Sequence, residues 1–222
     1  MMTLEKFEEA SELVKKVTNP TKLIYSEYLS AQTGAKVYLK PENMQHTGAY
    51  KIRGAYYKIS TLTDEERSRG LITASAGNHA QGVAFAAKQF GCKATIVMPT
   101  VTPLIKVNRT KSFGADVVLH GDVYDDACNY ALNLAQKEGY TFIHPFDDPA
   151  VATGQGTIAM EIIQELPRLR EKVSDRAIMR AIHFFNENKR VVKQVEALEN
   201  DTRIRAGVFD GDLSRGSFAR YV

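Results

Sequence analysis

Hydrophobic positions along the chain follow two periods, one typical of helices and one typical of strands. Apolar residues spaced along one helical face predict a helix over residues 4–17, which Asn19-Pro20 ends. Short strands are expected at residues 22–25 and 36–40, and a further helix over residues 51–60. The first third of the chain is therefore mixed helix and strand.

From Gly70 to about Leu166 one plan repeats: an apolar, β-rich run, a polar loop, a helix and a closing glycine. Glycine enters the left-handed region freely, so it is typical of the residue just past a helix end. This alternation predicts βαβ units, and hence an α/β fold with a parallel sheet and helices on both faces. The four runs are Leu71–Thr73, Ala94–Met98, Val117–Leu119 and Thr141–Ile143, the glycines are Gly91, Gly114 and Gly139, and a last helix is expected over residues 157–166.

The composition is that of a globular protein and argues against a nucleic-acid-binding or membrane protein. The chain is 44% hydrophobic, and a net charge of +3 is too small to indicate a nucleic-acid or membrane partner. Residues 168–222 hold 12 Lys and Arg against 8 Asp and Glu, whereas the rest holds 17 against 18, so the tail is basic. No apolar run approaches the roughly 20 residues that span a bilayer, and the acidic N-terminus is no signal peptide. Cys92 and Cys128 lack metal-ligand spacing, which favours reduced thiols in a cytoplasmic protein.

Three segments carry candidate chemistry. Lys51 follows a Thr-Gly turn and begins a helix; burial or nearby positive charge would lower its pKa from about 10.4 and make the amine nucleophilic. Residues 73–82, Thr-Ala-Ser-Ala-Gly-Asn-His-Ala-Gln-Gly, lie between a strand and a helix, where small residues suit a carboxylate or phosphate. Residues 152–157 place two glycines before the last expected helix. A solvated surface lysine and ordinary loop glycines are the alternatives.

Together these segments resemble the fold-type II pyridoxal-phosphate enzymes, in particular the threonine ammonia-lyase (threonine dehydratase) branch. The resemblance covers residues 4–166. Its motifs are Lys40-Pro41-Glu42-Asn43, Lys51-Ile52-Arg53-Gly54-Ala55, Ala74 to Gly82, Met98-Pro99, Pro103 to Val107, Phe113 to Val117, His144-Pro145-Phe146-Asp147 and Gly154-Gln155-Gly156-Thr157.

The resemblance implies a cofactor, a reaction and residue roles. Lys51 would hold pyridoxal 5'-phosphate covalently and later move the Cα proton, while Tyr50 would pack beside the cofactor ring and Asn78 would contact its hydroxyl. The reaction would be β-elimination of water from L-threonine or L-serine, giving a 2-oxo acid and ammonia. Ala76 stands where related racemases carry a second serine base, which favours elimination. The expected substrate-binding residues are Ser75, Gly77, Asn78, His79 and Gly154.

The resemblance also implies a division of the chain. Residues 1–60 would begin a large cofactor domain, 61–147 would form a small α/β domain, 148–166 would return to the large domain, and 167–222 would be a divergent tail. Within that tail, Ser174 as a helix cap and an apolar face that follows it predict a helix over 174–190. The expected partners are a small amino-acid substrate and, in a homo-oligomer, further copies of the chain. A role in amino-acid metabolism follows, with isoleucine biosynthesis and catabolism both open.

The chain departs from the family after Leu166, where a strand and a glycine-rich run would cradle the cofactor phosphate. Residues 167–175 show no such run, and Lys193-Gln194-Val195 replaces an expected small-residue loop. Since backbone amides are the main non-covalent anchor of such a phosphate, two hypotheses stay open. One is an active lyase whose phosphate site is rebuilt elsewhere; the other is a catalytically inactive, cofactor-free relative that serves as an interaction module.

Overall fold

The computed structural model describes residues 2–169, with side chains as far as Glu165, and these residues contain a four-stranded parallel sheet. The strand order is β5-β4-β3-β6, and each neighbouring pair is parallel. The predicted α/β class is confirmed. The strands are β3 (Leu71–Ala74), β4 (Ala94–Met98), β5 (Asp116–Leu119) and β6 (Thr141–Phe142), each within one residue of the predicted run at either end.

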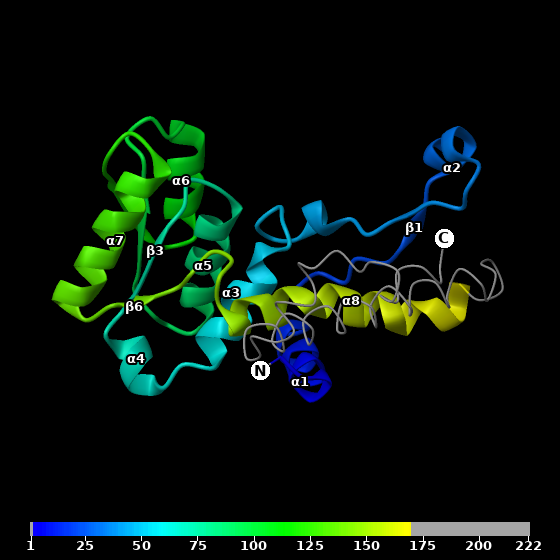
Figure 1. Ribbon diagram of the computed structural model, residues 1–222, viewed down its shortest axis with the longest axis horizontal. Coiled ribbons are helices and arrows are strands. Elements are labelled where there is room, and N and C mark those ends of the chain that lie inside the picture. The colour runs from blue at the N-terminus through cyan, green and yellow to red at the C-terminus, as the bar shows by residue number, and fades with distance from the viewer. Residues whose placement is uncertain (1, 170–222) are drawn as a thin grey trace, which may run out of the picture. The chain divides into compact units, whose positions relative to one another are not determined.

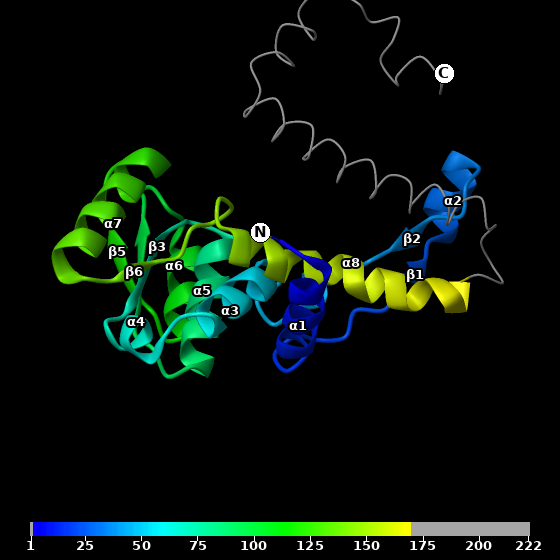
Figure 2. The ribbon, with the colours of Figure 1, turned by 60° about the horizontal axis from the view of Figure 1, so that its bottom comes forward.

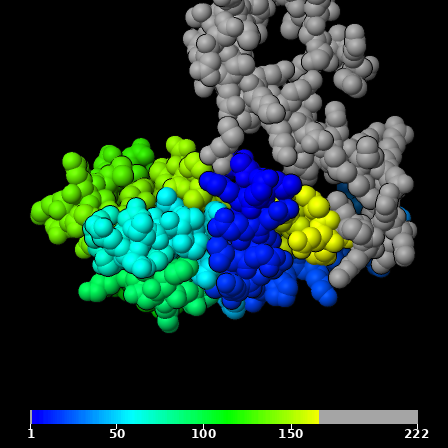
Figure 3. Space-filling view, turned by 90° about the horizontal axis from the view of Figure 1, so that it is seen from below, coloured from blue at the N-terminus to red at the C-terminus, as the bar shows by residue number. Residues whose placement is uncertain are grey.

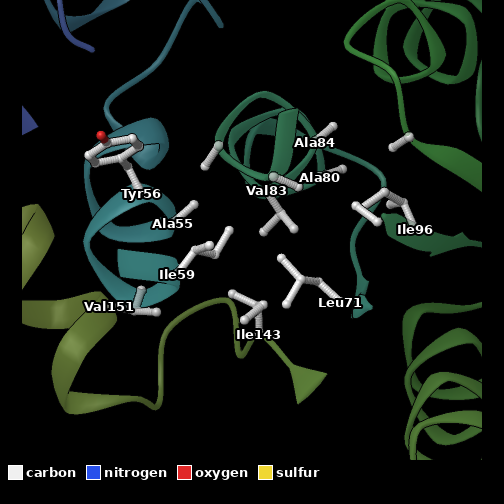
Figure 4. Close-up of a cluster of buried hydrophobic side chains, with 14 of the residues drawn as sticks. Ala55, Tyr56, Ile59, Leu71, Ala80, Val83, Ala84, Ile96, Ile143 and Val151 are labelled. Atoms are coloured by element: carbon white, nitrogen blue, oxygen red, sulfur yellow. The ribbon is translucent and has the colours of Figure 1, made fainter. Parts of the chain in front are cut away.

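Strand β3 is buried along its whole length because helices cover both faces of the sheet. On one face, Ile72 and Val97 pack with Ala127 of α7 (Tyr124–Glu138). On the other, Leu71 and Ile96 belong to the core that contains α5 (Asn78–Gln89). Figures 1 and 2 show α7 and α5 on opposite sides of β3, and Figure 4 shows Val83 of α5 above Leu71 and Ile143.

The connecting helices end as the glycine pattern predicts. Gly91, Gly114 and Gly139 have φ values of 65°, 95° and 75°, which place all three in the left-handed region. They follow α5, α6 (Leu104–Ser112) and α7, respectively. A short helix, α4 (Asp64–Ser68), precedes β3. Glycine at these positions lets each chain segment turn directly into the next strand.

The N-terminal part holds smaller elements. Helix α1 (Leu4–Val14) ends three residues before the predicted limit, and α3 (Lys51–Ser60) has the predicted bounds. Strands β1 (Ile24–Tyr25) and β2 (Tyr38–Leu39) form a separate antiparallel pair and are shorter than expected. Between them lies α2 (Glu27–Thr33), which the hydrophobic pattern did not predict, and β2 leads into a 3-10 helix, η1 (Glu42–Met44).

Helix α8 (Pro149–Leu169) begins eight residues before the predicted start, so the expected loop at residues 152–157 is wrong. Asp148 caps the helix, since its Oδ1 accepts hydrogen bonds from the N–H groups of Ala150 and Val151 at 2.8 and 3.0 Å. The two glycines lie inside the helix, where they permit close packing. A Cβ at Gly154 would lie 2.6 Å from the Arg53 carbonyl oxygen, and one at Gly156 would lie 2.3 Å from the Phe7 ring. Figure 3 shows the side chains of α1 against those of α8.

Several predictions lie outside this description. Residues up to Glu165 form one unit and a second begins at Leu166. Residues 167–169 continue α8, whereas the helix predicted over 174–190 and the departures after residue 169 lie outside the described residues. The domain division at residues 60, 147 and 166 stays a prediction. Within the described part, no helix is long and apolar enough to cross a membrane.

The contact between α3 and α8 predicts a sharp difference between two glycines. Gly154→Ala should lower the free energy of unfolding by about 2 kcal/mol, because the new methyl group would overlap the α3 backbone. Gly77→Ala is the control, since a Cβ there meets nothing within 4 Å. Urea denaturation of both variants measures the difference. Equal urea midpoints for Gly154→Ala and Gly77→Ala would contradict the packing described for α8.

Candidate active site

Lys51 is the first residue of α3, and it is half-buried. The Nζ donates a hydrogen bond to the carbonyl oxygen of Pro145 at 2.8 Å and lies 5.7 Å from the centroid of the Tyr50 ring. Burial lowers the pKa of the Lys51 amine below its ordinary value. Among the ion pairs of the described residues, none joins a carboxylate to Lys51. A lysine in such surroundings is a better nucleophile than one on an open surface.

The turn between β3 and α5 presents free hydrogen-bonding groups. Helix α5 begins at Asn78 with Gly77 as its N-cap and no capping side chain, so the first N–H groups of the helix have no side-chain partner in the described structure. Around Gly77 there is open space, since a Cβ there would touch nothing within 4 Å. The exposed Asn78 amide makes no hydrogen bond to any described residue. This arrangement suits an anion, because uncapped N–H groups and the helix dipole both favour negative charge.

His79 is buried, and only 3% of the residue is exposed. Its Nε2 lies 3.1 Å from the Ile143 carbonyl oxygen, which makes Nε2–H the donor and leaves Nδ1 unprotonated and without a hydrogen bond among the described residues. Burial is the main cause that lowers the pKa of His79 to about 4, and the charge of Lys51 adds to it. The imidazole is therefore neutral at physiological pH.

The segment after β6 brings these elements together. The Ile143 carbonyl accepts hydrogen bonds from His79 and, at 2.7 Å, from the Thr73 hydroxyl, while the Pro145 carbonyl accepts from Lys51. His144 closes a turn, because its Nδ1 accepts from the Asp147 N–H at 2.7 Å. Lys51, the α5 start and residues 143–145 thus meet at the carboxyl end of the parallel strands, where open α/β sheets bind ligands.

The predicted site residues divide into two groups. Tyr50, Lys51, Ser75, Gly77 and Asn78 lie around this end of the sheet, and His79 contributes a buried side chain that fixes residue 143. Gly154 is different, since it packs on the α3 backbone at Arg53 and Gly54 within α8. Close packing already explains a glycine at that position, and the binding roles of all these residues stay predictions.

Three features of the site have little signal in the sequence. The Pro145 carbonyl that holds the Lys51 amine is a backbone group, which every residue carries. Gly82 backs Lys51, since a Cβ there would lie 3.0 Å from the Lys51 carbonyl carbon and oxygen. Arg53 is fully buried although arginine is rarely found inside. For Gly82 the sequence shows only a small residue within a helix. For Arg53 it shows only a charged residue within a mostly apolar stretch.

The side chains at this end of the sheet fit an organic cofactor that carries an aldehyde and a negatively charged group better than they fit a metal ion. A lysine with a lowered pKa, and with no carboxylate partner among the described residues, can form a covalent bond to an aldehyde, and an exposed amide such as that of Asn78 can bond a hydroxyl. Within the part of the chain that the structure describes, no group of three His, Cys, Asp or Glu side chains is arranged to hold a metal ion. Lys51 and Asn78 stay the residues predicted to hold such a cofactor.

The fold and the site together define an α/β protein with a half-buried lysine of lowered pKa at the carboxyl edge of a parallel sheet. The family model for pyridoxal-phosphate dependent enzymes matches residues 14–191, so the chain belongs to this family. It is 54% identical over 167 residues to the L-threonine ammonia-lyase of Thermotoga maritima, a match that covers 75% of the chain. The resemblance noted from the sequence motifs is confirmed.

Solved structures agree. The processed form of threonine deaminase isoform 2 from Solanum lycopersicum superimposes with a TM-score of 0.69 at 43% identity and covers 74% of the chain. A pyridoxal 5'-phosphate-dependent aspartate racemase superimposes with a TM-score of 0.71 at 33% identity and covers 75%. The matches span 42% of the Thermotoga protein, 47% of the tomato chain and 52% of the racemase chain, so the chain corresponds to about half of each.

The buried, neutral His79 predicts a pH effect on stability. Between pH 6.5 and 4 the unfolded chain binds a proton at this position and the folded chain does not, so the free energy of unfolding falls as the pH drops, by up to about 3 kcal/mol. In His79→Gln, which keeps a donor for the Ile143 carbonyl, this part of the pH dependence should vanish. Urea denaturation of both proteins at pH 6.5 and pH 4.5 measures it. If both proteins lost the same free energy of unfolding between the two pH values, His79 would not be its cause.

Proposed function

We propose that this chain carries the lysine-centred active site of a pyridoxal-phosphate-dependent threonine/serine ammonia-lyase. The observation that carries the proposal is the Lys51 amine, whose pKa is lowered by burial and which lies beside an uncapped helix start. The family model and the similarity to L-threonine ammonia-lyase support the same cofactor and substrate class.

Each residue has a chemical task in this proposal. Bound pyridoxal 5'-phosphate supplies an electron-accepting ring for the pair left at the substrate Cα. Asn78 orients the ring hydroxyl, and the N–H groups at the start of α5, with Ser75 beside them, bind the substrate carboxylate. Lys51 removes the Cα proton, and the β-hydroxyl leaves with a proton as water. Hydrolysis of the released enamine then yields 2-oxobutanoate from L-threonine, or pyruvate from L-serine, together with ammonia.

Elimination is favoured over racemisation at this site. Racemisation needs a second group that returns a proton to the opposite face of Cα. Ala76, in the turn before α5, has a methyl side chain that carries no exchangeable proton. The similarity to an aspartate racemase therefore reflects the shared fold in this proposal, not a shared outcome.

Oligomer formation and a cytoplasmic location belong to the proposal. A homo-oligomer with other copies of the chain is its expected assembly, and a place in amino-acid metabolism, either isoleucine biosynthesis or threonine catabolism, follows from the reaction. The name of the Thermotoga relative supports threonine as the substrate.

A second candidate function rests on the length of the matches. The chain spans about half of its relatives, and a glycine-rich phosphate cradle is not evident in its sequence. A phosphate that lacks its backbone amides loses several charge-assisted hydrogen bonds, each worth about 1.5–3 kcal/mol. The second candidate is therefore a cofactor-free relative that keeps the fold and binds other proteins.

Two measurements on the full chain test the lyase. Addition of pyridoxal phosphate should produce the absorbance band of a lysine-bound cofactor, and L-threonine should then be converted to 2-oxobutanoate. Lys51→Ala should abolish the band and lower the rate at least a thousandfold, because both the covalent anchor and the base are lost. Lys137→Ala is the matched control, since 80% of the Lys137 side chain is exposed.

The outcomes separate the candidates. No band at millimolar cofactor would reject the lyase and favour the cofactor-free domain. A band without 2-oxo acid, but with D-allothreonine from L-threonine or D-serine from L-serine, would replace elimination with inversion at Cα. If the band persisted in Lys51→Ala, another lysine would be the residue that holds the cofactor.

A further inference from the structure

Arg53 lies two residues after Lys51 and is 0% exposed. Its Nε and Nη2 donate to the two carboxylate oxygens of Glu42, each at 2.8 Å. Its Nη1 and Nη2 donate to Glu161 at 2.6 and 3.1 Å, and Nη1 also lies 3.2 Å from the Thr157 hydroxyl. One guanidinium thus connects η1, α3 and α8 through a planar set of donors that lysine does not have.

The carboxylates that hold Arg53 are themselves fixed. Glu42 accepts a hydrogen bond from the Thr21 hydroxyl at 2.6 Å, and Glu161 pairs with Lys40 at 2.6 Å. Burial opposes the ionisation of Glu42, yet the hydrogen bonds from Arg53 and Thr21 outweigh it and hold the pKa of this carboxyl below its ordinary value. Glu42 therefore keeps its charge, and hydrogen bonds or ion pairs hold both carboxylates in place.

Helix α3 needs an anchor at this end. Its N-cap residue, Tyr50, makes no side-chain capping hydrogen bond, and the preceding Gly48 has a φ of 72°. A helix start of this kind frays unless other contacts hold its first turn. Arg53 lies in that turn, and its side-chain hydrogen bonds to Glu42 and Glu161 hold the turn in place without capping its backbone N–H groups.

The anchor and the reactive amine lie on different sides of the helix. Residues two apart on an α-helix do not face each other, so Arg53 and Lys51 project in different directions. The Lys51 main chain is in addition backed by Gly82 of α5, and its amine reaches Pro145. Any rotation or retreat of the first turn of α3 would move the Lys51 amine relative to the Pro145 carbonyl and the start of α5.

We propose that Arg53 is a positioning residue for Lys51: the Glu42–Arg53–Glu161 cluster fixes the first turn of α3 and so determines where the lysine amine lies. The proposal rests on the proposed function in that the positioned amine is taken to be the cofactor-binding group. A purely structural role is the competing account. Buried ion pairs contribute little net stability compared with apolar groups of the same volume, so a geometric role explains their presence better.

The test compares two substitutions with a surface control. Arg53→Lys keeps the charge but loses the planar donors, and Arg53→Met removes the charge. Arg69→Met is the matched control, because Arg69 also pairs with a glutamate, Glu65, at 2.9 Å but leaves 42% of its side chain exposed. All are made in the full chain and studied well below the urea concentration at which each unfolds.

Two readouts report on the Lys51 amine. The first is the pH dependence of its acylation by a small reagent, followed by mass spectrometry of the Lys51 peptide, which needs no cofactor. The second is the rate at which the absorbance band forms with pyridoxal phosphate. Both Arg53 variants should shift the acylation profile and slow band formation at least tenfold, since a displacement near 1 Å is enough for such losses. Arg69→Met should stay within twofold of the unchanged protein in both.

Each outcome decides the proposal. Folded Arg53 variants with unchanged acylation profile and band rate would overturn it, even if their unfolding free energy is lower. If neither Arg53 variant folds, Glu161→Gln, which weakens only one side of the cluster, decides by the same readouts. If the unchanged chain forms no band, the proposed function fails, whereas the acylation profiles still support or overturn the role of Arg53.

Discussion

The close approach of α3 to α5 and α8 is the constraint on which the site depends. Glycine makes it possible on both sides: Gly82 faces the Lys51 main chain, and Gly154 faces the Arg53 carbonyl and Gly54. With side chains at these points the helices would be pushed apart. The buried Arg53 cluster then fixes helix α3 in this close approach, and Lys51 is the first residue of α3.

The chemistry of the site follows from this placement. Burial lowers the pKa of Lys51, and the Pro145 carbonyl gives its amine a defined position. The uncapped start of α5 offers N–H groups for an anion, and neutral His79 holds the neighbouring chain at Ile143. In the proposed function the Lys51 amine is the nucleophile and the start of α5 binds the substrate carboxylate.

Much of this could be predicted from the sequence, and the failures have physical reasons. The four strands, the closing glycines and the bounds of α3 follow from local periodicity and turn chemistry, which act over a few residues. Local pattern predicts a loop at Gly154 and Gly156 and so a later start for α8, whereas tertiary packing against α3 and α1 demands small residues there. The Pro145 carbonyl and the partners of Arg53 depend on contacts between residues far apart in the chain, which no local pattern reports.

The central claim is that Lys51 is the amine that binds the cofactor. Borohydride reduction of the full chain after incubation with pyridoxal phosphate, followed by peptide mapping, tests it most directly. The account predicts one stoichiometric pyridoxyl group on Lys51 and only traces on exposed lysines such as Lys137. A label spread over surface lysines, with Lys51 unmodified, would contradict it.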